Sequence, residues 1–313
     1  MTATAAQGMT PVPPPPGFLR FLARPRIIAI ASIVVLADLG WAYLGLMVAG
    51  VAYDGHAVTL GPGMGVFDML AFPGIDALGR ALIQALCRPS FGGAAGLAGS
   101  FPAVDLTLVW LMWVAMVLAM MLPTAVPMVT TYAEIAGAAA AKQEPVVSPL
   151  VLMAGYGAVW LGFAFVATLL QWGLARIALI DPAMASASAL FSGAVFIGAG
   201  AYQFSALKHA CLMRCQHPFP FIFANWSAAR AGVFRLGLRQ GLDCLGCCWA
   251  MMLVMFAVGV MNIVWMAALG AIMAGEKLGT GTRFARAVGM VFVAIGVVFV
   301  ISAVVAHWPA RAG

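Results

Sequence analysis

Five of the six cysteines lie between residues 211 and 248, in two closely spaced groups. Cys211 and Cys215 stand four positions apart, which places both thiols on one face of a helix. Cys244, Cys247 and Cys248 follow in the stretch GLDCLGCCWAMM, and an advance of about 100° per residue gathers these three thiols on one face as well. Thiols at these spacings can bind a soft metal ion or exchange a disulfide.

Methionines continue this pattern. Met251 and Met255 extend the face of the second cysteine group, so that thiols and thioethers form one stripe. Met116 and Met120 are spaced four apart in an earlier apolar stretch, and Met121 follows them directly. Methionine is also an ordinary packing residue of apolar helices, so this row of methionines by itself is better explained by packing. Because the methionines occur together with the cysteine groups, we favour a series of sulfur ligands along which a soft metal ion could pass.

The donor types narrow the choice of metal. Thiolate and thioether sulfur select copper in its monovalent state, whereas zinc binds thiolates but gains little from a thioether. We therefore expect Cu(I), and zinc fits less well. His209 stands beside the first cysteine group, and imidazole also binds copper. The predicted metal ligands are Cys211, Cys215, Cys244, Cys247, Cys248, Met251, Met255, Met116, Met120, Met121 and His209.

The composition is that of an integral membrane protein. Of the 313 residues, 64% are hydrophobic and 8% are charged, and the mean hydropathy is +1.03. A soluble domain of this size would not tolerate such a surface. Apolar stretches long enough for spanning helices recur, whereas a membrane barrel would show shorter alternating segments. The fold class is therefore all-α, a polytopic transmembrane helical bundle surrounded by the lipid bilayer.

We expect about seven spans. The expected helices cover 27–51, 106–130, 150–175, 188–206 and 287–307, and 242–275 is either one tilted helix or two short ones broken around VGVMN. Seven spans place twelve of the 16 basic residues on the inner side, and six spans place only ten there. Cytoplasmic loops carry the excess of basic residues. The N-terminus is therefore expected in the cytoplasm, with the chain in the inner membrane of a bacterium.

This topology divides the chain simply. Residues 1–26 are predicted to form a disordered, Pro-rich cytoplasmic tail, and 27–313 a single transmembrane domain. Within that domain we expect an outer loop at 52–105 and a basic inner loop at 207–241. The net charge of +6 belongs to this inside bias, and no nucleic-acid motif is present, so nucleic acid is not an expected partner.

Three polar residues fall within the apolar stretches. Asp38 lies in the middle of the first span, where an exposed charge is costly, so we expect it to face the bundle interior. Asp243 precedes the second cysteine group at the expected start of a helix, where a carboxylate would stabilise the helix end. Asn262 lies at the expected break and is predicted to bond freed backbone groups.

Several blocks resemble a family of predicted metal-binding integral membrane proteins of unknown function. The blocks are AMMLPTAVPM, MASAS, GAYQFSALKHACLMRC, GLDCLGCCWAMM, GVMNIVWMAAL and EKL, which together extend over about 105–280. The resemblance implies a helical membrane protein with a metal site. It departs from the expected pattern at Gln216, where a basic residue would follow the second cysteine; Arg214 stands before that cysteine instead. The positions that the resemblance implicates are Met120, Met121, Pro123, Cys211, Cys215, Cys244, Cys247, Cys248 and Asn262.

Three functions compete. The first is a copper-binding membrane protein that transports, sequesters or delivers the ion, with a protein partner in copper handling or in a membrane complex. The second is a membrane thiol-disulfide oxidoreductase that uses the pairs Cys244/Cys247 and Cys211/Cys215. The third is an assembly subunit that docks through small-residue faces, such as those at Gly155, Gly157 and Gly162. The methionine ridge favours copper, because thiol exchange has no use for thioethers.

Overall fold

The computed structural model describes residues 25–53, 57–69, 103–180, 186, 188–279 and 281–307. Within these residues the secondary structure consists of helices, apart from one isolated bridge between Ile180 and Ser186. The all-α class is confirmed. The N-terminal tail before Pro25, most of the expected outer loop with Cys87, and most of the MASAS block lie outside the described residues.

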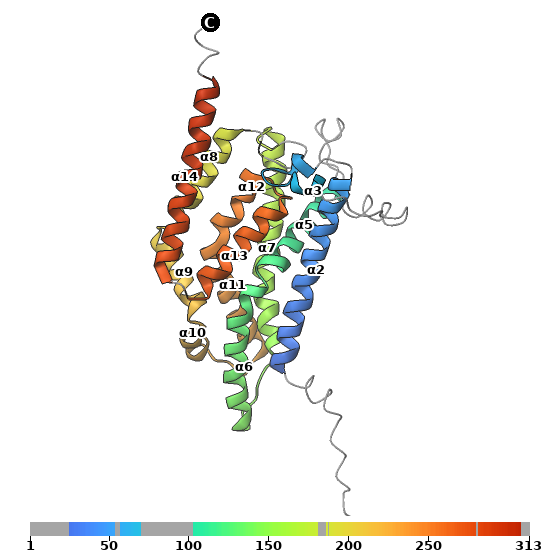
Figure 1. Cartoon of the computed structure of the whole chain (residues 1–313). Helices are drawn as coiled ribbons and strands as arrows, with labels where there is room; N and C mark the ends of the chain where they lie inside the picture. The colour runs from blue at the N-terminus through green and yellow to red at the C-terminus, as the bar shows by residue number, and fades with distance from the viewer. Residues whose placement is uncertain are drawn as a thin grey trace, which may run out of the picture.

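The helices follow one another as a bundle (Figure 1). The first half of the chain forms α2 (Pro25–Tyr53), the short η1 (Ala57–Leu60) and α3 (Val66–Met69), α5 (Ala103–Met120), η2 (Pro123–Ala125), α6 (Val126–Ala141) and α7 (Pro149–Arg176). The second half forms α8 (Ala189–Tyr202), α9 (Ala206–Gln216), α10 (Pro218–Ala224), α11 (Arg230–Leu253), α12 (Met255–Val258), α13 (Ile263–Lys277) and α14 (Gly281–His307).

Several helices are long and apolar enough to cross a membrane. Four qualify alone, and up to six if each bent pair, α5 with α6 and α8 with α9, counts as one span. Helix α13 has 15 residues, a length of about 22 Å at the usual rise per residue, which is shorter than the roughly 30 Å of a bilayer core. The start of α2 and the end of α14 lie at opposite ends of the bundle (Figure 1).

Helix α11 occupies the centre of the bundle. In its most apolar window, together with α12, 72% of the residues are buried, against 22–33% in α2, α7 and α14. It crosses α7 closely, because a Cβ on Gly155 would lie 2.2 Å from the Phe234 carbonyl oxygen and one on Gly237 would lie 2.1 Å from that of Leu152. Gly155 thus serves packing within this chain, while Gly157 and Gly162 face open space.

Two bends shape the bundle around its centre. The helix axis turns by 44° between α5 and α6, at Pro123, and by 64° between α8 and α9. The first bend divides the helix expected over 106–130, since a proline ring cannot continue the backbone hydrogen-bond ladder. The second bend swings α9 across α11. The two bends lie at the junctions of α5 with α6 and of α8 with α9.

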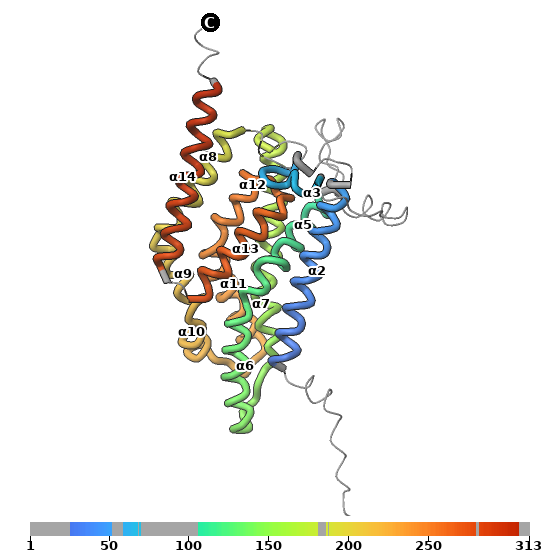
Figure 2. The backbone as a smooth tube through the Cα atoms, in the orientation of Figure 1, coloured from blue at the N-terminus to red at the C-terminus, as the bar shows by residue number. Residues whose placement is uncertain are grey.

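A third break separates α12 from α13 and confirms the two-helix prediction for 242–275. Figure 2 shows the chain rising through α11 and α12 and returning through α13. Gly259 has a φ of +104°, and a Cβ there would lie 2.2 Å from the Leu60 carbonyl oxygen, so only glycine fits. Asn262 caps α13 by accepting from the Trp265 amide at 3.1 Å and donates to the carbonyls of Val258 and Pro62. Its predicted role, bonding freed backbone groups, is confirmed.

Three sequence-based expectations are corrected by the structure. The expected basic loop at 207–241 is mostly helical, because α9, α10 and the first half of α11 occupy it. Consequently Asp243 lies well inside α11 and not at a helix start. Helix α11 begins at Arg230, and the basic residues and glycines between Arg230 and Asp243 are more typical of a loop than of an apolar helix. Asp38 is exposed, because the buried face of α2 runs through Ile33, Ala37 and Leu44.

Candidate metal centre

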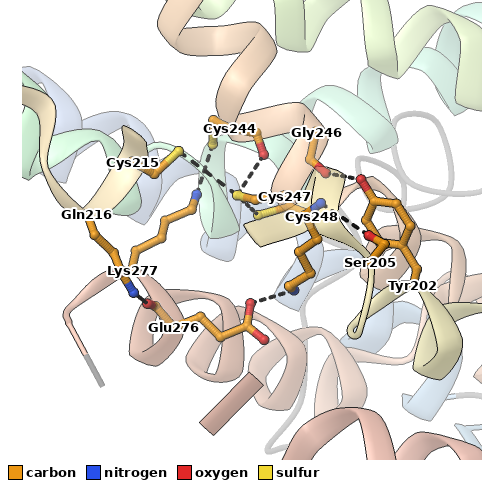
Figure 3. A network of polar contacts seen from close by, with 11 residues as sticks. Tyr202, Ser205, Cys215, Gln216, Cys244, Gly246, Cys247, Cys248, Glu276 and Lys277 are labelled. Carbon is orange, nitrogen blue, oxygen red and sulfur yellow. Dashed lines mark hydrogen bonds and ion pairs between the residues drawn. The ribbon is translucent and has the colours of Figure 1, made fainter. Parts of the chain in front are cut away.

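Three thiols from two helices meet in the core. Cys215 of α9 and Cys244 and Cys247 of α11 place their sulfur atoms within 4.8 Å of one another. The Cys215 and Cys247 sulfurs are 4.0 Å apart, and Figure 3 shows the three side chains pointing toward a common point. We call these three residues the thiol trio. The 211/215 and 244/247/248 groups are therefore brought together through Cys215.

The spacing of the trio suits one shared ion. A thiolate binds a metal such as zinc at about 2.3 Å, so three sulfurs around one ion stand roughly 4.0 Å apart, and two sulfurs on opposite sides of an ion stand roughly 4.6 Å apart. The observed separations, 4.0 Å for one pair and at most 4.8 Å for the others, fall at these values. Either arrangement therefore needs only small side-chain shifts.

The other two cysteines of the region stand beside the trio. The Cys248 sulfur lies 3.3 Å from that of Cys247, yet Cys248 does not belong to the group in which all sulfurs approach one another. Cys211 lies one turn before Cys215 and faces Gly246, where an added Cβ would come within 2.6 Å of its sulfur. All five thiols are free.

Polar contacts hold α9 against its neighbours. Ser205 caps α9 by accepting from the Lys208 amide at 3.1 Å, a contact that stabilises the helix start after the bend. Arg214 donates to Asp243 at 3.0 Å. The Gln216 side-chain amide donates to the Glu276 carbonyl oxygen at 2.6 Å. Gln216, the departure from the expected basic residue, thus links α9 to α13.

A buried lysine touches the trio. The Lys277 ammonium, at the end of α13, donates to the Cys244 sulfur at 2.9 Å and to the Thr124 hydroxyl at 2.7 Å, and the residue is only 5% exposed. Figure 3 shows its side chain reaching toward Cys244. Nothing in the spacing of the sequence predicts Lys277 as a site residue. The one available signal is its place in the EKL block of the resemblance.

Tyr156 of α7 supplies a further contact to the same sulfur. Its hydroxyl lies 3.1 Å from the Cys244 sulfur and donates to the Met121 carbonyl oxygen, also at 3.1 Å. That carbonyl is available because the helix breaks after α5, and the Thr124 hydroxyl donates to it as well at 2.7 Å. The bend at Pro123 therefore forms one wall of the site. Sequence reasoning missed Tyr156, because nothing local relates it to Cys244.

An ion pair lies below the trio between α9 and α13. The Lys208 ammonium donates to the Glu276 carboxylate at 2.7 Å, and the two side chains are 0% and 1% exposed. Removing one member of a buried pair leaves an uncompensated charge, which is far more costly than losing an exposed pair. This contact therefore fixes α9 relative to the helix that carries Lys277.

The predicted methionine ligands are all buried, and His209 stands apart from the trio. Met251 and Met255 continue α11 and α12 into the core, Met116 and Met120 lie on α5, and Met121 follows its last residue. Met120 packs against Gly270 of α13. Nδ1 of His209 is buried without a hydrogen-bond partner among the described residues, but His209 is not in the group of ligand atoms that can share one ion.

Access to the trio differs between its members. Cys244 and Cys247 are 3% and 1% exposed, whereas Cys215 on α9 is half-buried. Cys215 is consequently the most exposed member of the trio.

Comparison with known proteins agrees with this site. The model of one protein family, PpoB2, described as "Copper chaperone", matches residues 110–299, which is more than half of the chain and includes the thiol trio, Tyr156 and Lys277. No curated protein and no solved structure matches the chain. The match to a copper-related family supports the metal-binding part of the resemblance, and the site is compatible with copper.

Proposed function

Because this chain belongs to the PpoB2 family of copper chaperones, we propose that it binds one Cu(I) ion with Cys215, Cys244 and Cys247 and delivers the ion to a partner protein. The observation that carries this proposal is the convergence of three free thiols from α9 and α11 within 4.8 Å. Copper is here the cargo of the protein and not a resident cofactor.

The donor set supports the monovalent ion. Thiolates select Cu(I) among the copper ions. Structural zinc sites close a tetrahedron with four protein ligands, whereas the group that can share an ion among the described residues has three members. Zinc is therefore the weaker candidate.

Delivery requires that the ion leave a buried site. Cys215 is the trio member nearest the surface, so an incoming ligand of the partner replaces its sulfur first, and the Cys244 and Cys247 sulfurs release the ion last. Cys248, whose sulfur is 3.3 Å from that of Cys247, is placed to hold the ion in an intermediate position. We assign Cys211 and His209, which lie on α9 together with Cys215, to the entry of the ion.

The methionines form the apolar but soft surroundings of this route. Thioethers bind Cu(I) weakly and without charge, which suits transient contact. We assign this role to five buried methionines, which lie on α5, directly after it, on α11 and on α12. These are Met116, Met120, Met121, Met251 and Met255.

A seven-span arrangement fits this function, with the N-terminus in the cytoplasm of a bacterium and the bundle in its inner membrane. The opposite positions of the two helix ends (Figure 1) support an odd number of crossings. In this arrangement the seven crossings are α2, α5 with α6, α7, α8 with α9, α11 with α12, α13 and α14. Basic residues gather in α9 and the first half of α11, which favours a cytoplasmic position for that end, where thiols stay reduced.

Anaerobic metal analysis tests the proposal. Protein purified without oxygen and loaded with Cu(I) is expected to hold one ion per chain, and serine at any trio position should abolish or greatly weaken this binding. Cys211→Ser is the matched control, because it removes a neighbouring thiol outside the trio. Loss of copper in the control alone, or no copper in the wild type, would overturn the proposal.

Thiol exchange remains the alternative, since the Cys247 sulfur lies 4.0 Å from Cys215 and 3.3 Å from Cys248. The predicted pairing of Cys211 with Cys215 is less direct, because Cys211 faces Gly246. Trapping free thiols with an alkylating reagent in cells separates the two functions. A chaperone keeps the trio reduced, whereas an oxidoreductase shows a disulfide that changes with the redox state of its partner.

A further inference from the structure

We infer that Lys277 makes the thiol trio selective for a monovalent ion and excludes divalent metals. This inference rests on the proposed function and names the residue that sets its metal specificity. Its basis is the contact of a buried ammonium with a trio sulfur, at 2.9 Å.

The charge of Lys277 is directed at the trio. Among the described residues, the ion pairs are Arg26 with Glu134, Lys208 with Glu276, and Arg214 with Asp243. Lys277 belongs to none of them, and its two hydrogen-bond partners are the Thr124 hydroxyl and the Cys244 sulfur. A buried cation without a carboxylate needs another negative partner. The thiolate of Cys244 is the group that can serve.

The nearby ion pairs do not cancel this charge. Lys208 and Glu276 neutralise each other at 2.7 Å, and Arg214 and Asp243 do so at 3.0 Å. One uncompensated positive charge therefore remains next to the trio.

A fixed positive charge discriminates between ions of different valence. For any given number of thiolates, the complex of a divalent ion carries one more positive charge than that of Cu(I). An ion about 2.3 Å from the Cys244 sulfur lies within about 5 Å of the ammonium. At an effective dielectric constant of about 20, Coulomb's law then penalises the divalent ion relative to Cu(I) on the order of 100-fold in affinity. The difference of one charge is the same for two and for three thiolate ligands.

The position of Lys277 leaves the space between the three sulfur atoms free for the ion. It approaches Cys244 from α13 and is anchored on its other side by Thr124, next to the broken end of α5. Figure 3 shows it beside Cys244, while Cys215 and Cys247 face each other. The positive charge therefore lies beside the trio and not between its sulfur atoms.

The test is the ratio of Cu(I) to Zn(II) affinity, measured on the full chain in detergent by competition with a chromogenic chelator for each metal. Lys277→Met is expected to lower this ratio at least 10-fold. The Cu(I) complex is more negative by one charge than the Zn(II) complex, so it loses more electrostatic stabilisation when the ammonium is removed. Lys277→Arg should restore most of the ratio, since it returns the charge. Arg283→Met, which removes an exposed positive charge near the start of α14, should leave the ratio unchanged.

Two further measurements keep the test decisive. Lys277→Gln retains a polar side chain beside Thr124 and serves if the methionine variant does not fold. Ag(I) and Cd(II), two soft ions of different charge, should show the same change in ratio. Equal losses for both metals in Lys277→Met and Lys277→Gln would overturn the inference and leave the proposed function intact. Wild-type protein that binds no Cu(I) would overturn the proposed function itself, and this inference with it.

Discussion

Arg214 of α9 and Asp243 of α11 form an ion pair of 3.0 Å, and each directly precedes a cysteine of the thiol trio. The Arg214 side chain is 59% exposed and that of Asp243 is 10% exposed, so the pair lies at the edge of the core. It joins the two helices at the point where their thiols meet. Asp243, expected to stabilise a helix start, instead positions α9.

Asp243→Asn is expected to weaken Cu(I) binding about 2- to 5-fold with unchanged stoichiometry. An ion pair with one exposed partner contributes about 0.2–1 kcal/mol, and its loss relaxes the contact of α9 with α11 without removing a ligand. Cu(I) competition at low and high salt measures the effect, which should shrink at high salt. Arg235→Gln, which removes an exposed charge from the same helix, is the control, and an equal loss there would contradict this role.

Gly246→Ala should weaken Cu(I) binding several-fold by pushing α9 away from α11. The added Cβ would come within 2.6 Å of the Cys211 sulfur but 3.5 Å from its Cβ. Cys211→Ala in the Gly246→Ala background should therefore restore binding, because it removes the obstructing sulfur. The double-mutant cycle measures this coupling by Cu(I) affinity. If the two losses simply add, Cys211 does not form the contact that separates the helices.

Tyr156→Phe tests the contact on the other side of Cys244. The hydroxyl bonds both the Cys244 sulfur and the Met121 carbonyl, and its removal should cost about 1 kcal/mol. We expect about a 5-fold loss of Cu(I) affinity and a lower thermal midpoint in detergent. Tyr132→Phe removes a buried hydroxyl that bonds Val147, away from the trio. That control should lower the midpoint without changing copper affinity.

Glu276→Gln should destabilise the protein by roughly 3–5 kcal/mol, because it leaves the Lys208 ammonium buried without its partner. The pair is completely enclosed between α9 and α13. The double variant Lys208→Met with Glu276→Leu should recover much of this stability, since it buries no charge. Denaturant unfolding in detergent compares the three proteins. A double variant as unstable as the single one would show that packing, not charge, dominates here.

Asn262→Ala should lower stability by about 1–2 kcal/mol, the usual cost of losing a helix cap. The variant removes the cap of α13 and two donated hydrogen bonds to Val258 and Pro62. Asn225→Ala, at the end of α10, is the matched control with a smaller expected effect, because Asn225 is only partly buried. Thermal unfolding measures both. Similar midpoints would mean that the close approach of Gly259 to Leu60 holds the break without Asn262.

Helical periodicity accounts for what the sequence could predict of the site. Cys244 and Cys247 are three positions apart, and within one helix that spacing alone makes them neighbours. The same rule placed Cys211 beside Cys215 but could not choose between them. That choice depends on the 64° bend before α9, which turns Cys215 toward the trio and Cys211 toward Gly246. Hydrophobic composition likewise predicted the apolar helices, but it did not predict the polar first half of α11, which was expected to be a loop.

The sequence by itself determined the helical class, the expected ranges of most apolar helices and the soft character of the donors, and it offered a break near Asn262 as one of two alternatives. These features are local, because they follow from hydrophobic length, proline and glycine positions, and spacing along one helix. Only the tertiary structure decided which thiols meet and which groups touch them. Lys277 stands 33 residues from Cys244 and Tyr156 stands 88 residues from it. Contacts over such separations arise from how helices cross, and helix crossing depends on packing against the whole bundle.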